Sequence, residues 1–183
     1  TFSKYINVKS LGSKVFINEI KSNSSVFFIE PAIRRFELKA KSSNYKLIFI
    51  GPVIKRKGIE DFLAVLSLVK HKGVEGHIIG KVVDRNLLKE SIEQYNIDES
   101  LLPIHGQLEY KQICNILCKK SIYLLTSHIE NSSNSLLECL CSGIPSIAYD
   151  TGSTKSFIKD DENGYITSIF QYRLMSEKVD EII

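Results

Sequence analysis

The sequence predicts an α/β fold in which a mainly parallel sheet carries helices on both faces. From Lys46 onward, short runs of β-branched or apolar residues alternate with longer amphipathic runs, a pattern typical of βαβ units. The composition, 43% hydrophobic and 25% charged residues, is that of an ordinary globular protein. No apolar run approaches the roughly 20 residues of a membrane-spanning helix. These observations together indicate a Rossmann-like architecture.

The elements follow from this alternation in chain order. We expect strands over residues 46–50, 77–79, 102–105, 122–125, 146–149 and 165–167. We expect helices over residues 58–71, 86–95, 110–119, 134–141 and 154–158, and from residue 171 to the end.

Residues 1–45 do not share this rhythm. They hold two apolar pieces, 15–20 and 26–29, then Pro31 and a polar, basic link over 34–44. We interpret 1–45 as a remnant of a preceding domain with an interdomain linker, and 46–183 as the Rossmann-like domain.

Charge is distributed unevenly. Residues 1–57 contain 12 of the 24 Lys and Arg but three of the 21 acids, so they carry +9 within a net charge of +3. Such a flank suits a diphosphate, a nucleic acid or an anionic membrane surface, and solvated lysines are the ordinary alternative. Residues 1–20 lack the apolar centre of a signal peptide, so we expect a cytoplasmic location.

The four cysteines, Cys114, Cys118, Cys139 and Cys141, lie inside apolar, helical segments. This placement favours reduced, buried thiols. Cys114 and Cys118 share a helix face, which leaves a metal site as an alternative.

Ligands of parallel α/β sheets bind beyond the carboxyl ends of the strands, and three loops at that edge have suggestive residues. The first runs from Gly51 to Gly58 and places Lys55, Arg56 and Lys57 at a helix start. The helix dipole disfavours cations there, and a bound anion would remove the conflict. A turn glycine and surface lysines are the alternative interpretation.

The second loop leads into the helix over 134–141 and carries Glu130, with Glu138 eight residues later. A ligand over the helix start could touch both carboxylates. Alternatively, Ser135-x-x-Glu138 is a capping box in which Glu138 satisfies a backbone N–H. The third loop contains Gly152 and several hydroxyls. His105 and His128 lie at strand ends near the same edge, where a structural role is the alternative.

Together the loops resemble the donor-binding half of the retaining glycosyltransferases of group 1, or family 4, which have the two-domain GT-B fold. The family pattern is a glycine with a later Lys-Gly, then Glu-x7-Glu, Gly-x-Pro and a Gly-rich turn. In this chain these are Gly51 with Lys57-Gly58, Glu130 through Glu138, Gly143-Ile144-Pro145, and Gly152. The string ENSSNS is similar to a subgroup motif, Glu-Asn-Ser-Pro-Asn-Ser. The arginine that usually follows the first glycine is Pro52 here, which removes one phosphate contact.

The resemblance implies two catalytic residues: Lys57 on the donor diphosphate and Glu130 facing the transferred sugar. Glu138 would accept hydrogen bonds from the ribose hydroxyls. The resemblance implies three groups of donor-binding residues. His105 and Gly106 would lie near the base, and Asn131, Ser132, Ser133, Asn134 and Ser135 near sugar and phosphate. The others are Gly51, Lys57, Glu138 and Gly152. The substrate is a nucleotide-sugar, with UDP-sugar preferred, and no cofactor, metal or nucleic acid is implied. The acidic run Asp160-Asp161-Glu162 is interpreted as a surface turn.

In that family the acceptor domain is N-terminal and about as large as this chain. We therefore expect a donor-binding domain of a larger polysaccharide-biosynthesis enzyme, inactive as an isolated fragment and in peripheral contact with the inner membrane face. The alternatives are a stand-alone nucleotide- or phosphate-binding regulatory module and one half of a nucleotide-sugar epimerase.

Overall fold

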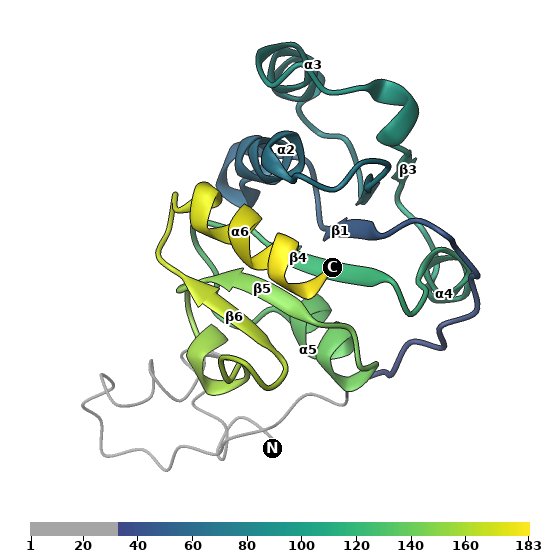
Figure 1. Cartoon of the computed structure of the whole chain (residues 1–183), viewed down its shortest axis with the longest axis vertical. Coiled ribbons are helices and arrows are strands. Elements are labelled where there is room, and N and C mark those ends of the chain that lie inside the picture. The colour runs from purple at the N-terminus through teal and green to yellow at the C-terminus, as the bar shows by residue number, and fades with distance from the viewer. Residues whose placement is uncertain (1–32) are drawn as a thin grey trace, which may run out of the picture.

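A computed structural model describes residues 33–183, and it contains one six-stranded, wholly parallel sheet (Figure 1). The strand order is β3-β2-β1-β4-β5-β6, which is the Rossmann order. The strands are β1 (Lys46–Ile50), β2 (Glu75–Ile79), β3 (Ile104–Gly106), β4 (Ser121–Leu125), β5 (Ser146–Tyr149) and β6 (Gly164–Thr167). The predicted fold class is confirmed.

Helices cover both faces of the sheet. The α-helices are α2 (Ile59–Leu68), α3 (Arg85–Gln94), α4 (Tyr110–Ile116), α5 (Asn134–Cys141) and α6 (Tyr172–Ile182). Three short 3-10 turns are η2 (Lys55–Lys57), η3 (Glu99–Leu101) and η4 (Thr154–Ser156). One apolar core joins α2, α3 and α6 to one face, and a second joins α4 and α5 to the other (Figure 1). Alternate residues of the central strands feed the two cores, as expected for strands buried on both faces.

Several predicted boundaries are wrong by two or three residues. β2 starts two residues earlier than expected, and β3 is displaced toward Gly106. α2 ends at Leu68 and α4 at Ile116, because Val69 and Leu117 adopt extended backbone conformations. The helix expected over 154–158 is only the η4 turn.

The described part of the N-terminal flank packs against the domain. Phe36 is buried, and its backbone N–H donates to Ser142 Oγ at 2.7 Å. The backbone N–H groups of Lys39 and Ala40 donate to the carbonyls of Cys114 and Leu117. The predicted boundary at residues 45 and 46 stays a prediction, and the apolar pieces over 15–20 and 26–29 lie outside the described residues.

The cysteine prediction is wrong at one position. Cys114, Cys118 and Cys139 are buried free thiols, but Cys141 is exposed because it lies in the last turn of α5, on the side away from the sheet. Within residues 33–183, no three His, Cys, Asp or Glu side chains are grouped so as to hold a metal ion.

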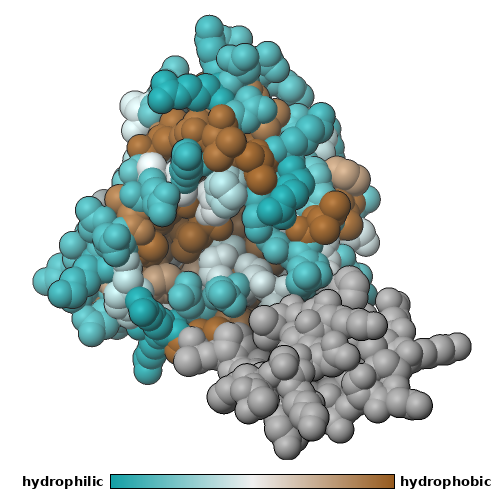
Figure 2. All heavy atoms as spheres, turned by 180° about the vertical axis from the view of Figure 1, so that it is seen from behind, coloured by the Kyte–Doolittle hydropathy of each residue, from teal (hydrophilic) through white to brown (hydrophobic). Residues whose placement is uncertain are grey.

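The surface is mostly hydrophilic on the side that Figure 2 shows, and apolar side chains form separate areas on it. The exposed large apolar residues of the described chain are Val83, Ile104, Ile129, Phe170 and Leu174. None of the helices in residues 33–183 has the length and apolar character that crossing a bilayer requires.

Candidate functional site

The candidate site lies where the strand order reverses. β1 is central and pairs with β2 on one side and β4 on the other. From β1 the chain continues to β2 and β3 on one side, and from β4 it continues to β5 and β6 on the other, so the strand order reverses between β1 and β4. This switch point is the usual ligand position of open parallel α/β sheets. The loop after β1 carries Lys57 and the loop after β4 carries Glu130.

Lys57 and Glu130 are in direct contact. The Lys57 ammonium forms an ion pair with Glu130 Oε1, and the two side chains are 18% and 10% exposed. The sequence separates them by 73 residues, and the parallel topology brings their two loops to the same edge of the sheet. A cation and a carboxylate at this point could bind the two ends of one ligand. The ammonium would bind an anionic group, and the carboxylate would accept hydrogen bonds from hydroxyl groups.

Gly58 allows the two loops to approach closely. Its φ is +67°, and a Cβ built on it would lie 2.0 Å from the Thr126 carbonyl oxygen. Thr126 Oγ1 in turn donates to the Lys57 carbonyl at 3.2 Å. Only glycine satisfies both the left-handed conformation and the contact. Lys57 owes its position beside the β4 loop to this glycine. The three cations of the loop belong to η2, and α2 itself begins with Glu60 and Asp61 in its first turn.

Gly51 extends the same loop toward β2. Its N–H donates to the Ile79 carbonyl at 2.9 Å, and its own carbonyl oxygen would lie 1.9 Å from a Cβ on Gly80. A Cβ on Gly51 would meet Lys57 Cδ at 3.9 Å. The predicted pair Gly51 and Lys57 is therefore adjacent in space.

Helix α5 follows the loop that carries Glu130, and its cap is Ser133. The Ser133 side chain accepts a hydrogen bond from the Leu136 N–H. Ser135 lies inside the helix, where its hydroxyl meets Tyr123 Oη at 2.8 Å and Ser133 Oγ at 3.0 Å. Asn131, Ser132 and Asn134 are exposed.

The capping-box interpretation of Glu138 is wrong, because the cap of α5 is Ser133. Ser135, which the capping box requires as the cap, is the second residue of the helix. The Glu138 carboxylate is half-buried and has no hydrogen-bond partner among residues 33–183. Burial raises the pKa of this carboxyl, while the charge of Arg34 opposes the shift. A half-buried acceptor without a partner is available to a ligand.

Gly152 packs closely against the backbone of the loop that carries Glu130. Its φ is +56°, and a Cβ there would lie 2.3 Å from the Glu130 carbonyl oxygen and 2.5 Å from that of Asn131. The N–H and hydroxyl of Ser153 both donate to the Asn131 carbonyl, at 3.1 and 3.0 Å. The loop after β5 therefore holds the Glu130 loop in place through backbone contacts.

His105 lies on the edge strand β3, away from Lys57, and belongs to a polar chain that the sequence did not reveal. His105 Nε2 is 3.0 Å from His77 Nδ1, and His77 Nε2 is 2.9 Å from Glu75 Oε2. Because the carboxylate accepts, the order of donors runs from His105 through His77 to Glu75. Burial lowers the pKa of both histidines, and the His77 hydrogen bond lowers that of Glu75.

Gly106 connects this edge with the first loop. Its carbonyl accepts from the Gly80 N–H at 2.8 Å, and Gly80 packs on Gly51. The structure thus brings Lys57, Glu130 and Gly152 together, leaves Glu138 on the adjoining helix, and places His105 and Gly106 two strands away.

His128 also has a partner that sequence reasoning missed. His128 Nε2 lies 2.7 Å from Asp61 Oδ2, and the side chains are 19% and 10% exposed. Asp61 is on α2, four residues after Lys57, and His128 is two residues before Glu130. An acid in the first turn of a helix is ordinary, so no signal in the sequence distinguished Asp61.

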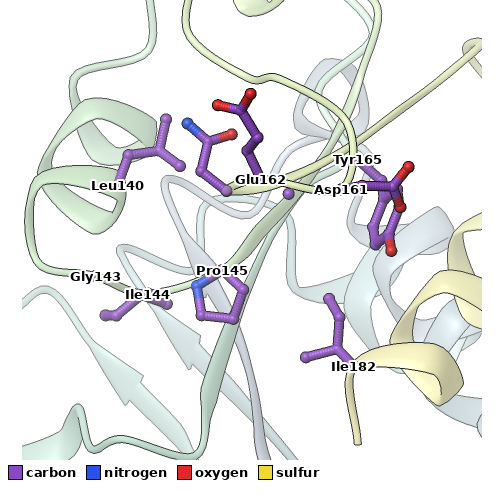
Figure 3. A pocket seen from close by; sticks show the side chains of 10 residues that line it. Leu140, Gly143, Ile144, Pro145, Asp161, Glu162, Tyr165 and Ile182 are labelled. Carbon is purple, nitrogen blue, oxygen red and sulfur yellow. The ribbon is translucent and has the colours of Figure 1, made fainter.

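A separate cavity of about 270 Å³ lies at the opposite edge of the sheet (Figure 3). Pro145 and Asn163, which line it, directly precede β5 and β6, and Ile182 of α6 closes one side. Ligands of parallel sheets bind at the other ends of the strands, so this cavity is distinct from the candidate site.

Comparison with known proteins decides the family. The model of the group 1 glycosyl transferases matches residues 32–183. The chain belongs to the group 1 glycosyltransferase family. The family model therefore covers all of the described residues, including both loops that meet at the switch point.

The similar proteins of this family are longer than the chain. An amylovoran biosynthesis glycosyltransferase of Erwinia amylovora, AmsD, is 24% identical over 166 residues, 90% of this chain and 46% of that protein. A poly(ribitol-phosphate) alpha-N-acetylglucosaminyltransferase of Staphylococcus aureus is 26% identical over 73% of this chain and 27% of its own length. The chain spans about half the length of these relatives or less.

Solved glycosyltransferase structures have the same fold. The apo lipopolysaccharide outer core galactosyltransferase WaaB superposes with a TM-score of 0.76 at 20% identity, over 95% of this chain and 52% of that one. A point mutant of S. aureus TarM, in complex with fondaparinux, alpha-GlcNAc-glycerol and UDP, gives a TM-score of 0.69 at 24% identity, over 91% of this chain and 34% of that one. These neighbours establish the Rossmann-like half of a GT-B fold.

Proposed function

We propose that residues 46–183 are the donor-binding domain of a retaining glycosyltransferase, which moves a sugar from a nucleotide-sugar to a hydroxyl of a glycan or lipid-linked acceptor. The observation that carries the proposal is the contact between Lys57 and Glu130 at the switch point, beside the start of α5. Membership of the group 1 family supports sugar transfer as the reaction.

Lys57 and the start of α5 bind the diphosphate in this proposal. The leaving nucleoside diphosphate accumulates negative charge as the sugar bond breaks, and a preorganised ammonium with helix N–H groups stabilises that charge. Lys57 is the catalytic cation, with the backbone of residues 131–135 beside sugar and phosphate. No metal ion or other cofactor takes part.

The carboxylates of Glu130 and Glu138 accept hydrogen bonds from hydroxyl groups of the donor in this proposal. Glu130 faces the transferred sugar, next to the diphosphate that Lys57 holds. Glu138 accepts hydrogen bonds from the ribose, a role that suits a half-buried carboxylate without a hydrogen-bond partner among residues 33–183. The base lies toward His105 and Gly106, at the ends of β2 and β3. The UDP in the complex of the similar TarM structure supports a UDP-sugar as donor.

The acceptor side of the cleft belongs to a further domain in this proposal. The lengths of AmsD and WaaB, about twice that of this chain, support an additional N-terminal half. The +9 segment over residues 1–57 faces that half or an anionic membrane surface on the cytoplasmic side.

A nucleotide-binding regulatory module is the second candidate, and Pro52 favours it. The position after Gly51 lacks the cation that a second phosphate contact needs. Lys55 and Arg56 are exposed in the same loop and are the nearest substitutes in sequence. Sugar transfer by the full-length protein distinguishes the two candidates.

Titration calorimetry with UDP, GDP and ADP tests the donor site. We expect heat of binding with UDP and weaker binding or none with the other two. The Lys57→Ala variant should bind UDP less tightly and bind uridine, which has no phosphate, as the parent does. Absence of heat with all three nucleotides would contradict the proposal.

The Glu138→Gln variant tests the ribose contact. A ribose diol needs two acceptors, and an amide offers one oxygen. Losing a charge-assisted hydrogen bond should cost roughly 1.5–3 kcal/mol, about ten- to a hundredfold in UDP affinity. The melting temperature should hardly change, because Ser133 caps α5. UDP binding equal to that of the parent would show that Glu138 does not contact the ribose.

A further inference from the structure

Two segments flank the candidate site and are tied together at several points. The first contains Lys57 and leads into α2, and the second contains Glu130 and leads into α5. The backbone N–H of His128 donates to the Arg56 carbonyl at 2.9 Å. Arg56 precedes Lys57, and His128 lies two residues before Glu130, so this bond joins the two segments next to the ion pair.

The side chains of Asp61 and His128 make a second tie between the same segments. His128 Nε2 is 2.7 Å from Asp61 Oδ2, and the Asp61 residue is 7% exposed. A buried carboxylate is costly without a partner, so the histidine and the acid hold each other in one geometry. Asp61 is fixed to Lys57 through the first turn of α2, and His128 is fixed to Glu130 through one intervening residue.

Two aromatic rings lie beside the imidazole of His128. The ring centroid of Phe170 lies 4.6 Å from that of His128, and the ring of Tyr149 lies at 6.3 Å on a stacked plane. Phe170 has a φ of +69° and is 61% exposed. A left-handed backbone is costly for a bulky residue, yet its ring remains over His128. The His128 and Asp61 side chains are 19% and 10% exposed, so their hydrogen bond has little contact with water.

We propose that Asp61 and His128 are positioning residues that set the register between Lys57 and Glu130, and so determine how tightly the site holds a diphosphate. This inference rests on the proposed function for its ligand, but its geometric part concerns the ion pair alone. Neither residue touches the diphosphate or the sugar. Their effect reaches the ligand through Lys57, because only Gly58 and the first residues of α2 separate Asp61 from that lysine.

Replacing both partners by apolar groups tests the tie without leaving a buried charge unpaired. The main variant is Asp61→Leu with His128→Leu. The conservative variant is His128→Gln, whose amide N–H can still donate to Asp61. The matched control is His71→Leu, because His71 is exposed in the turn after α2. Thermal unfolding of each 183-residue variant verifies that it is folded.

The first readout is acetylation of lysines followed by mass spectrometry, without added nucleotide. Lys57 is 18% exposed in its ion pair, whereas Lys89 is 78% exposed and serves as the internal reference. We expect Lys57 to react severalfold faster, relative to Lys89, in the double variant than in the parent. His128→Gln and His71→Leu should match the parent. Unchanged reactivity of Lys57 in the double variant would overturn the proposal.

The second readout compares UDP with uridine by titration calorimetry. The double variant should bind UDP about three- to tenfold more weakly, the range typical of residues coupled in one network, and bind uridine unchanged. In a Lys57→Ala background the same double change should cause no further loss. Equal losses for UDP and uridine, or additive losses with Lys57→Ala, would indicate a merely structural pair and overturn the proposal.

The two readouts separate the inference from the proposed function. If the parent binds no UDP, the donor-site proposal fails, and the acetylation result still decides whether Asp61 and His128 position Lys57. If the parent binds UDP and the double variant binds it equally well, the positioning role fails and the donor site stands.

Discussion

At the scale of single residues, the Glu130 carboxylate and the diphosphate of the proposed donor compete for the Lys57 ammonium. The Lys57 ammonium contacts the Glu130 carboxylate, so an arriving diphosphate must displace that carboxylate. The displaced Glu130 is then free to accept hydrogen bonds from a sugar. The two proposed roles are therefore linked, because binding of the phosphate to Lys57 releases the group that addresses the sugar.

We expect Glu130→Gln to bind UDP more tightly than the parent, although Glu130 is proposed as a catalytic residue. Removing the carboxylate frees Lys57 from its ion pair while Asp61 and His128 still hold the two segments together, so we expect UDP affinity to rise by about two- to fivefold, or about 0.5–1 kcal/mol. Titration calorimetry with UDP measures the gain. The same variant should show a smaller gain or a loss with a UDP-sugar, because the sugar contact is impaired. Weaker binding of UDP would mean that Glu130 does not compete for Lys57.

A second residue-scale prediction concerns Gly152. An alanine there must adopt φ +56° and place its Cβ 2.3 Å from the Glu130 carbonyl oxygen. The backbone of the Glu130 loop must shift, so we expect a loss of about 2–4 kcal/mol in the free energy of unfolding together with weaker UDP binding. Urea unfolding and calorimetry measure the two effects.

Gly143 supplies the matched control for that change. Its φ is +73°, but a Cβ there meets no heavy atom within 4 Å among the described residues. Gly143→Ala should lose only the conformational term of about 1–2 kcal/mol and bind UDP as the parent does. If the two variants behaved alike, the contact between Gly152 and the Glu130 loop would have no role in the site.

At the scale of elements, the sequence predicted the central strands better than the helix ends. Residues 47–50 and 147–149 are apolar, and the interior of each strand is buried; the structure has strands over 46–50 and 146–149, with the predicted bounds. The ends of α2 and α4 depend on where Val69 and Leu117 become extended, and tertiary contacts decide that. The α-helix expected over 154–158 became a 3-10 turn because the Thr154 side chain bonds back to the Tyr149 carbonyl at 3.1 Å.

The candidate site was predictable to the extent that parallel topology determines it. Strands in parallel put the loops after β1 and β4 at one edge, so Lys57 and Glu130 were expected near each other. Their direct ion pair was not, since loop conformation depends on the left-handed Gly58 and on Gly152. Pairs that join distant segments, such as Asp61 with His128, leave no periodic signal in a single sequence.

The pair of strands β2 and β3 gives a prediction on pH. Burial lowers the pKa of His77 and of His105, and His77 is only 5% exposed. The unfolded chain takes up protons near the ordinary histidine value of about 6.5, and the folded chain does so only at lower pH. The contribution of these histidines to the free energy of unfolding is therefore fully present above about pH 6.5. It decreases as the pH falls toward the lowered pKa values of the folded chain.

We expect the His77→Leu variant to lose part of this acid sensitivity. Melting temperatures at several values between about pH 7 and about pH 5 give the slope, which should be shallower than that of the parent. His71→Leu removes an exposed histidine and should keep the parental slope. Glu75 acts at lower pH, because its pKa is lowered by His77 and Asn44. An identical slope in His77→Leu would mean that this histidine does not govern the acid response.

At the scale of the whole molecule, the described residues supply one side of the proposed donor site. Lys57, Glu130 and the start of α5 form that side, and both proposed ends of the donor contact it. AmsD and WaaB are about twice as long as this chain, and the superposed WaaB chain extends well beyond the region that this chain covers. A donor bound here would keep one side open to water. In the two-half proposal, the additional half excludes water and positions the acceptor.

We accordingly expect the 183-residue chain to bind UDP and a UDP-sugar but to transfer no sugar, whereas the full-length protein does both. Binding depends on Lys57 and Glu138, which this chain supplies, and transfer also requires an oriented acceptor hydroxyl, a term worth up to about 7–11 kcal/mol of barrier. Radiolabelled donor with glycan and lipid-linked acceptors measures transfer, and release of free sugar measures hydrolysis. The Lys57→Ala chain is the control for background. Transfer by the parent chain above that background would show that residues 1–183 contain the acceptor site, and the two-half proposal would be wrong.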